Sequence, residues 1–249
     1  MKHELITLAA MSLIIAGQAQ ADTLDARPFS LVAGGGAIVE TGIYTGANDQ
    51  VSPLPLLELT YGRWTADLDK GLGYNLIAGD RFTVSAAVAP RFAPDFPDAE
   101  LFSGMDRATA AEAGLHLGYD IGPIALSGSL RHDMSGVHNG MEAEVKLAYT
   151  MQLGPLGVET EIGARFLDEG LSAHLYGVAQ SEANEFRTAY APGSSWSPKA
   201  QLTVLMPISG TVIAGATASY EDFAQEIENS PLISATGQSQ AGIFLLKAF

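Results

Sequence analysis

The sequence predicts an all-β fold, a transmembrane antiparallel β-barrel of about twelve strands. Three observations predict it: apolar and polar residues alternate along most of the chain, short and long connections alternate between these segments, and the chain stops on Phe249 at the end of a segment with strand periodicity. Hydrophobic residues make up 47% of the sequence although the formal net charge is −15. Apolar residues spread over many short segments are typical of a barrel whose outer face contacts lipid.

The alternation is clearest in GMEAEVKLAYTM (140–151), where Met141 and Val145 share one face and Glu142 and Lys146 the other. A period of two predicts a strand, and no segment of comparable length shows the helical period of 3.6. Ten strands are the alternative count, and a soluble β-sandwich is the alternative fold. The expected strands are 29–41, 54–62, 63–69, 72–79, 81–92, 110–121, 123–134, 140–152, 155–167, 197–207, 210–221 and 237–249.

The connections predict how the barrel is threaded through a membrane. Short periplasmic turns and longer extracellular loops, with both termini in the periplasm, are typical of outer-membrane barrels, and an even strand number closes the sheet. Lys70–Gly71 is the one short connection on the long-loop side. The short turns are expected at Gly62, Gly79–Asp80, Gly122, Leu153–Gly154 and Ile208–Ser209, and the long loops at 42–53, 93–109, 135–139, 168–196 and 222–236.

The first 21 residues have the pattern of a secretory signal peptide, with an apolar stretch and Ala19-Gln20-Ala21 before the expected cleavage site. Residues 22–249 are then the outer-membrane β-barrel, and no later apolar run approaches the ~18 residues of a membrane helix. Cysteine is absent, so disulfides do not stabilise this exported chain. The acidic balance argues against nucleic acid as a partner.

The last segment places Ile243, Leu245 and Phe249 on one face. We expect this face to point outward and Phe249 to lie in the periplasmic aromatic girdle.

Charged residues are expected on the opposite, inward parity of several strands. With a two-residue turn at Leu153–Gly154, Lys146 would face Glu161 and Glu142 would face Arg165. Two interpretations remain open: a salt-bridged, nearly closed lumen, or a channel lining that selects by charge. The inward charges are Glu112, Asp120, Arg131, Glu142, Glu144, Lys146, Glu159, Glu161, Arg165 and Lys199.

The segment RHDMSGVHNG places His132, Asp133, Ser135 and His138 close together at the extracellular rim. A serine activated by a histidine would make this rim a hydrolase or deacylase site, whereas a polar hairpin loop is the favoured interpretation. No metal site and no cofactor is predicted. The acidic residues of 93–109 and 221–228 are interpreted as solvated loop charge, and the glycines 34–36 as part of a strand and not a phosphate loop.

Several segments together resemble the MipA/OmpV family of outer-membrane proteins. The more specific pieces are Tyr176-Gly177-Val178, followed by a polar stretch, and Ser230-Pro231 before the last strand. The segments are YTGANDQVSPLPLLELTYGRW (44–64), GLGYNL (71–76), SLRHDMSGVHNGMEAEV (129–145), LYGVAQSEA (175–183) and NSPLISATGQSQAGIFLLKAF (229–249).

The resemblance implies a barrel in the outer membrane of a Gram-negative bacterium, in contact with lipid and lipopolysaccharide and inserted by the barrel-assembly machinery, which would recognise Phe249. Some members of the family resemble scaffolds that link a lytic transglycosylase to a peptidoglycan synthase, and others have been treated as porins or adhesins. The leading hypothesis is therefore a non-enzymatic scaffold or anchor for murein-synthesising and murein-hydrolysing proteins. A porin-like channel for small solutes is the first alternative, and a hydrolase using His132 and Ser135 is the second.

Overall fold

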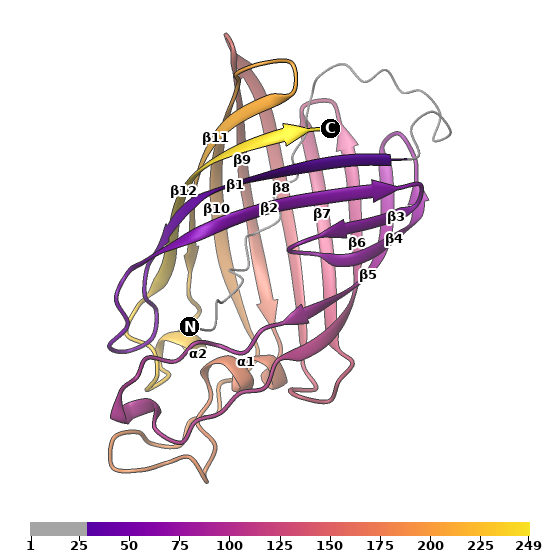
Figure 1. Cartoon of the computed structure of the whole chain (residues 1–249). Helices are drawn as coiled ribbons and strands as arrows, with labels where there is room; N and C mark the ends of the chain where they lie inside the picture. The colour runs from indigo at the N-terminus through magenta and orange to yellow at the C-terminus, as the bar shows by residue number, and fades with distance from the viewer. Residues whose placement is uncertain (1–28) are drawn as a thin grey trace.

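The computed structural model describes residues 29–249, which form one closed barrel of twelve antiparallel strands (Figure 1). Each strand pairs with its neighbours in chain order, and the last pairs with the first. The predicted fold and strand number are confirmed, and the ten-stranded and sandwich alternatives are wrong. The predicted signal peptide, 1–21, lies outside the described residues. The strands are β1 (Phe29–Glu40), β2 (Gln50–Tyr61), β3 (Trp64–Asp67), β4 (Gly71–Ala78), β5 (Phe82–Arg91), β6 (Ala110–Ile121), β7 (Ile124–Asp133), β8 (Met141–Leu153), β9 (Leu156–Leu167), β10 (Ser195–Pro207), β11 (Val212–Asp222) and β12 (Gly237–Ala248).

Tight turns that begin with glycine close three hairpins at one end of the barrel. Gly62, Gly122 and Gly154 have φ angles of 58°, 61° and 61°, in the left-handed region that glycine adopts at little cost. A first-position glycine is the feature of type II′ hairpins, whose twist suits flanking strands. The long connections join strands at the opposite end, so the predicted alternation is confirmed.

The start of β2 differs from the prediction. The strand begins at Gln50 and not at 54, so it includes Pro53, and it pairs with β1 along all twelve residues. Proline cannot donate a backbone hydrogen bond, so it fits a strand where that position has no partner strand. The structure shows that a neighbour on one edge is enough to hold this segment extended.

The hairpin of β3 and β4 is shorter than predicted. β3 spans four residues and not 63–69. The carboxylate of Asp67 accepts hydrogen bonds from the backbone N–H groups of Asp69 (2.6 Å) and Lys70 (2.9 Å), and this turns the chain early. The turn therefore stops well short of the long-loop end that the other strands reach, as Figure 1 shows.

The two faces of the wall differ as predicted. Val145 and Ile162 are 50% and 61% exposed, whereas Glu142 and Glu161 on the opposite parity are 3% and 7% exposed. An apolar outer face is the pattern expected of a barrel that contacts lipid. Large aromatic side chains are exposed near the short-turn end, where an aromatic girdle is expected: Tyr61, Trp64, Phe82, Tyr119 and Tyr149.

The glycines 34–36 lie inside β1, as expected, at its seam with β12. A Cβ on Gly34 would lie 2.0 Å from the carbonyl oxygen of Leu245, and one on Gly36 would lie 1.9 Å from that of Ile243. Glycine therefore lets the first and last strands approach closely enough to close the barrel.

The long loops pack into a cap over the other mouth (Figure 1). The cap contains α1 (Glu169–Tyr176), α2 (Gln225–Glu228) and the 3₁₀-helix η1 (Glu100–Phe102). Its apolar side chains form two clusters, one around Leu171 and Ile227 and one around Leu232. Within residues 29–249 no helix has the length and hydrophobicity needed to cross a bilayer.

Candidate functional site

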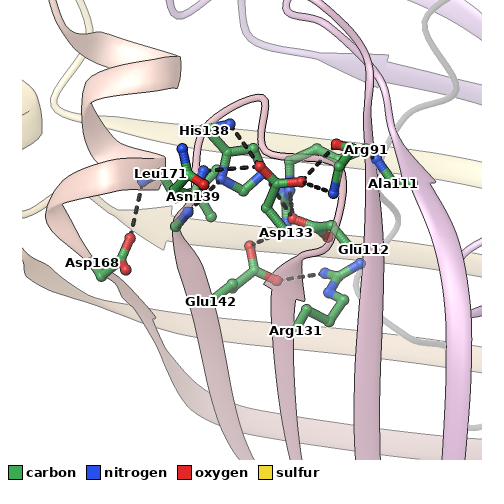
Figure 2. Close-up of polar contacts among 12 residues, drawn as sticks. Arg91, Ala111, Glu112, Arg131, Asp133, His138, Asn139, Glu142, Asp168 and Leu171 are labelled. Carbon is green, nitrogen blue, oxygen red and sulfur yellow. Dashed lines mark hydrogen bonds and ion pairs between the residues drawn. The ribbon is translucent and has the colours of Figure 1, made fainter.

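A network of buried ion pairs occupies the capped half of the lumen, with Glu142 at its centre (Figure 2). This β8 carboxylate lies 2.5 Å from Arg131, 3.1 Å from Arg91 and 3.9 Å from Arg165, and is 3% exposed. One carboxylate therefore holds guanidinium groups from three other strands, β7, β5 and β9. Buried charges are tolerated only when paired in this way.

The network continues to both sides of Glu142. Arg91 Nε is 2.5 Å from Glu112 Oε1, and Arg165 is 2.5 Å from Glu221 Oε1. A second group further along the lumen has Glu144 at its centre, 2.6 Å from Lys199 and 3.7 Å from Lys146, which is also 3.5 Å from Glu161. Positive and negative groups alternate across the strands, so no single sign dominates the lining.

Most of the predicted inward charges belong to this network, and two do not. Asp120 is exposed near the short-turn end, and Glu159 accepts a hydrogen bond from Thr150 at 3.3 Å without an ion pair. The structure adds Arg91 and Glu221, which sequence reasoning missed. Glu221 was assigned to an acidic loop, and this is wrong: it lies on β11, on the same parity as the inward Thr217, and that parity was the available signal.

The predicted register of β8 and β9 is also wrong. Glu144, and not Glu142, lies opposite Arg165, and Lys146 lies opposite Gly163. The turn is Gly154-Pro155 and not Leu153-Gly154, because the left-handed first position requires glycine. The expected partners still meet, but diagonally, since long side chains reach the next pair along the strand.

The histidines and the serine at the rim do not form a catalytic pair. Ser135 Oγ donates to the Asp133 carboxylate at 2.6 Å, and accepts from the Ala111 N–H at 3.1 Å. Asp133 also accepts from the backbone N–H groups of His138 (2.7 Å) and Asn139 (2.8 Å), so it holds the loop in shape (Figure 2). His132 is exposed on the outer face.

The ring of His138 lies beside the lumen network. Its Nδ1 accepts from the Gly140 N–H at 3.0 Å, and its Nε2 lies 3.3 Å from Glu112 Oε1. A nucleophilic serine needs a base within hydrogen-bond reach, and Ser135 has a carboxylate there instead. Within residues 29–249 there is also no group of three or more His, Cys, Asp or Glu that could hold a metal ion.

The residues of the resemblance form a joint inside the cap. Ser230 Oγ donates to the Tyr176 carbonyl at 2.6 Å and accepts from the Leu232 N–H at 3.2 Å. Tyr176 and Val178 are 4% and 3% exposed and belong to the two apolar clusters of the cap. Gly177 has no space for a side chain, since a Cβ would lie 2.5 Å from the Ala173 carbonyl oxygen. Pro231 follows in the turn that brings Leu232 into the cap.

Two arginines hold the loops of the cap together. Arg107 donates to the carbonyls of His174 (2.9 Å) and Gly177 (3.1 Å) and pairs with Glu182 at 2.5 Å. This hydrogen bond lowers the pKa of the Glu182 carboxyl. Arg187, 3% exposed, donates to the backbone carbonyls of Leu101 and Ser103. The cap is therefore a packed structure and not a set of separate loops.

Burial changes the titration of two side chains of α1. It raises the pKa of the Tyr176 phenol. Burial, with the His138 ring 5.2 Å away and Arg107 close by, lowers the pKa of His174 to about 4. Both groups are therefore neutral at pH 7, which suits a packed cap over a lumen that already contains many charges.

A cavity of about 230 Å³ remains between the cap and the ion-pair network. It extends from Tyr44 and Tyr176 of the cap to Glu142 of the network, and reaches Leu68 and Asp69 in the short β3–β4 turn.

The C-terminal face is oriented as predicted. Ile243, Leu245 and Phe249 are 68%, 56% and 66% exposed, and the Phe249 N–H donates to the Leu31 carbonyl at 2.9 Å. The role of Phe249 as an assembly signal stays a prediction.

A family model and curated relatives identify the family of this chain. A family model described as MltA-interacting protein MipA matches residues 33–249. The MltA-interacting protein of Escherichia coli (strain K12) is 28% identical over 250 residues, covering 97% of this chain and 98% of its own. The putative outer membrane protein YiaT of the same strain is 28% identical over 209 residues, covering 80% and 83%. Among solved structures, the translocator domain of autotransporter NalP from Neisseria meningitidis has a TM-score of 0.44 at 11% identity, covering 91% of each chain.

Proposed function

The chain belongs to the family of MltA-interacting protein MipA and is an outer-membrane β-barrel, and from that premise we propose that it is a non-enzymatic scaffold. Its partners would be a murein-hydrolysing lytic transglycosylase and a peptidoglycan synthase, which the barrel anchors at the membrane. A relative that aligns over nearly the whole chain is named for its interaction with MltA. This name supports the first partner, and the second rests on the resemblance seen in the sequence.

The observation that carries the proposal is the ion-pair network inside the barrel together with the packed cap over its mouth. Glu142 with its three arginines spans neighbouring strands on the inside of the wall, and the packed cap lies above it. A selective pore would more naturally present one dominant sign along an open path. A barrel whose interior is used to tie its wall together supports a role as an anchor, in which the outside surfaces do the binding.

The proposal is tested by crosslinking in intact membranes. An affinity tag is placed directly after the predicted cleavage site, so that Phe249 stays the terminal residue, and crosslinked complexes are purified and identified. We expect a lytic transglycosylase to be recovered, and to be lost from cells that lack it. A barrel of equal size from another family, expressed at the same level, is the control. Equal recovery on both barrels would overturn the scaffold.

A channel is the second candidate, because the cavity shows that the lumen is not filled completely. The wild-type protein in planar bilayers separates the two. We expect little steady conductance, and large, stable, ion-selective channels would favour the porin-like function instead. The hydrolase is disfavoured by the contacts of Ser135, which bonds to Asp133 and to no histidine.

A further inference from the structure

The barrel wall is incomplete between β2 and β5. β3 pairs only with residues 58–61 of β2, so within residues 29–249 the segment 50–57 has a strand partner on β1 and none on its other edge. Across the gap, β4 pairs with β5 from Thr83 to Val88, which leaves 89–91 beyond it. Figure 1 shows the β3–β4 hairpin ending between two longer strands.

The opening lies at membrane depth. The four residues of β3 rise only about 13 Å, whereas the apolar band of an outer-membrane barrel is about 25 Å tall. Unpaired backbone groups are not tolerated in contact with hydrocarbon, because each costs several kcal/mol unless something satisfies it. The backbone groups at this edge therefore need hydrogen-bond partners other than a neighbouring strand.

The hydrogen bonds of the hairpin show which backbone groups of β2 face the opening. The Arg63 carbonyl accepts from the Asn75 N–H of β4 at 2.8 Å, so the next residue, Trp64, directs its backbone groups to β2, opposite Tyr61. Because these directions alternate along a strand, the odd-numbered residues of β2 face β3 and, beyond it, the opening. Two of the four odd positions in 50–57 are prolines, Pro53 and Pro55.

The same argument places a third proline at the opposite edge. The Asp120 N–H of β6 donates to the Arg81 carbonyl at 2.8 Å, so odd-numbered residues of β5 face β6 and even-numbered ones face β4 or the opening. Pro90 is even-numbered and lies beyond the last pair with β4. Proline thus removes two of the four N–H donors that 50–57 would present to the opening and the donor at position 90, while the carbonyl acceptors remain.

Proline at these positions makes the edges poor templates for another strand, so neither a partner strand nor a second copy of this chain fits the opening well. The edges instead suit a ligand that donates hydrogen bonds. The side chains around the opening are apolar toward the lipid: Val51 is 77% exposed, Leu57 41% and Val88 47%. A ligand here would have both a donor group and an apolar part.

The cavity behind the opening has matching chemistry. Leu68 and Asp69 of the hairpin turn and Pro90 of β5 all line it, so the cavity adjoins the opening. Each basic side chain that lines it is bonded to a glutamate. Among residues 29–249 the Asp69 carboxylate accepts no hydrogen bond and forms no ion pair, although the charges of Arg131, Lys70 and Lys146 act on it from a distance. The available charge in the cavity is therefore negative.

We propose that the opening between β2 and β5 is a lateral binding site for a single-chain amphiphile with a protonated amine head. The amine enters from the bilayer and donates to Asp69 and to the carbonyls of the two proline-containing edges. The alkyl chain stays between the apolar side chains that flank the opening. This site is independent of the scaffold role, because it needs neither of the proposed murein partners.

The test uses photocrosslinking to the full barrel in phosphatidylcholine liposomes. The probe is dodecylamine with a diazirine near the head, compared with dodecanoic acid modified in the same way, and adducts are mapped by mass spectrometry. We expect the amine probe to label Leu68, Asp69 and Phe92 around the cavity, at least fivefold more than the acid probe. Unmodified dodecylamine should compete, and butylamine at the same concentration should not.

Asp69→Asn is expected to lower this labelling at least fivefold, and Asp80→Asn, at an exposed short turn, to leave it unchanged. Asp67 holds the turn through backbone N–H groups, so Asp69→Asn should fold, which heat-modifiable migration on a gel confirms. Adducts confined to lipid-facing side chains away from the opening, or equal labelling by the two probes, would overturn the site. Competition by butylamine equal to that by dodecylamine would overturn entry from the bilayer.

Discussion

The two sides of this barrel wall differ in how their strands are held together. From β6 to β10 every strand has at least ten residues and pairs along its length, and its inward charges join into a network around Glu142. From β2 to β5 the wall is interrupted by a strand of four residues. Arg91 of β5 still joins the network, whereas Asp69 in the β3–β4 turn takes part in no ion pair with any of residues 29–249. The barrel thus concentrates its internal bonding on one side and leaves the other adaptable.

The difference teaches what the buried charges do. Where the wall is complete, each pair links neighbouring strands from inside, and removing one member would leave its partners buried and uncompensated. Where the wall is open, prolines reduce the number of backbone N–H groups that would need hydrogen-bond partners. The strands that ion pairs hold rigid and the opening that gives access to the lumen therefore lie on different parts of the circumference.

The largest expected effect comes from removing the centre of the network. Glu142→Gln leaves three arginines without their shared carboxylate, and should lower the free energy of unfolding by about 3–5 kcal/mol. Asp69→Asn, on the open side, should change it by less than about 1 kcal/mol. Urea unfolding in detergent micelles, followed by tryptophan fluorescence, measures both. Equal losses would mean that the two sides do not differ in internal bonding.

A somewhat smaller effect is expected from charge on the lipid face of the complete wall. Ile162→Arg should cost about 2–4 kcal/mol near the middle of the bilayer. Gln201→Arg places the same side chain on the lumen face opposite Glu161, where a carboxylate can pair with it, and should cost far less. Unfolding from liposomes compares the two variants. A similar cost for both would contradict the sidedness of β9 and β10.

The sequence predicted most of the fold because the relevant signals are local. Period-two alternation located every strand, and glycine in the turns fixed where the hairpins reverse. The errors share a cause, since they arose where one residue decides between two geometries. The predicted start of β2 fell just after Pro53, although a strand with one free edge accepts proline, and Leu153-Gly154 was predicted as a turn that in fact begins at Gly154.

The lumen network was predictable in its members and less so in its pairing. Parity alone placed Glu142, Lys146 and Arg165 inside, but which carboxylate meets which cation depends on barrel shear and side-chain reach. Arg91 was missed because it precedes a loop, and its partners lie on distant parts of the chain. The opening was not predictable from the sequence, because it depends on how the lengths of the four neighbouring strands β2 to β5 compare.

A third test concerns the obstruction of the lumen. Lys146→Gln with Arg165→Gln removes two cations from the complete wall and leaves Glu161 and Glu221 without them. Repulsion among the remaining carboxylates should loosen the wall, so thermal stability falls and conductance in planar bilayers rises several-fold above the low wild-type level. Lys70→Gln, at the short turn and outside the network, is the matched control. Wild-type conductance that already equals the double variant's would show that the network does not narrow the lumen.

The smallest expected effect is a pH dependence of the stability of the cap. We expect it to be confined to the cap and not to reach the ion-pair network of the wall. Burial lowers the pKa of His174 to about 4, below its ordinary value of 6.5, so the unfolded loop takes up a proton at a higher pH than the folded one. The contribution of His174 is therefore fully present above pH 6.5 and is lost as the pH falls toward 4. We expect a loss of about 1–2 kcal/mol, less than the full shift implies because the cap borders water.

Hydrogen exchange of the amides in 168–194, corrected for the intrinsic rate at each pH, measures this loss. His174→Asn should flatten the dependence, and His132→Asn, on the exposed outer face, should not. If acid instead loosens the amides of β6–β9 first, the protonation acts on the network and not on the cap, and the separation between the two is wrong.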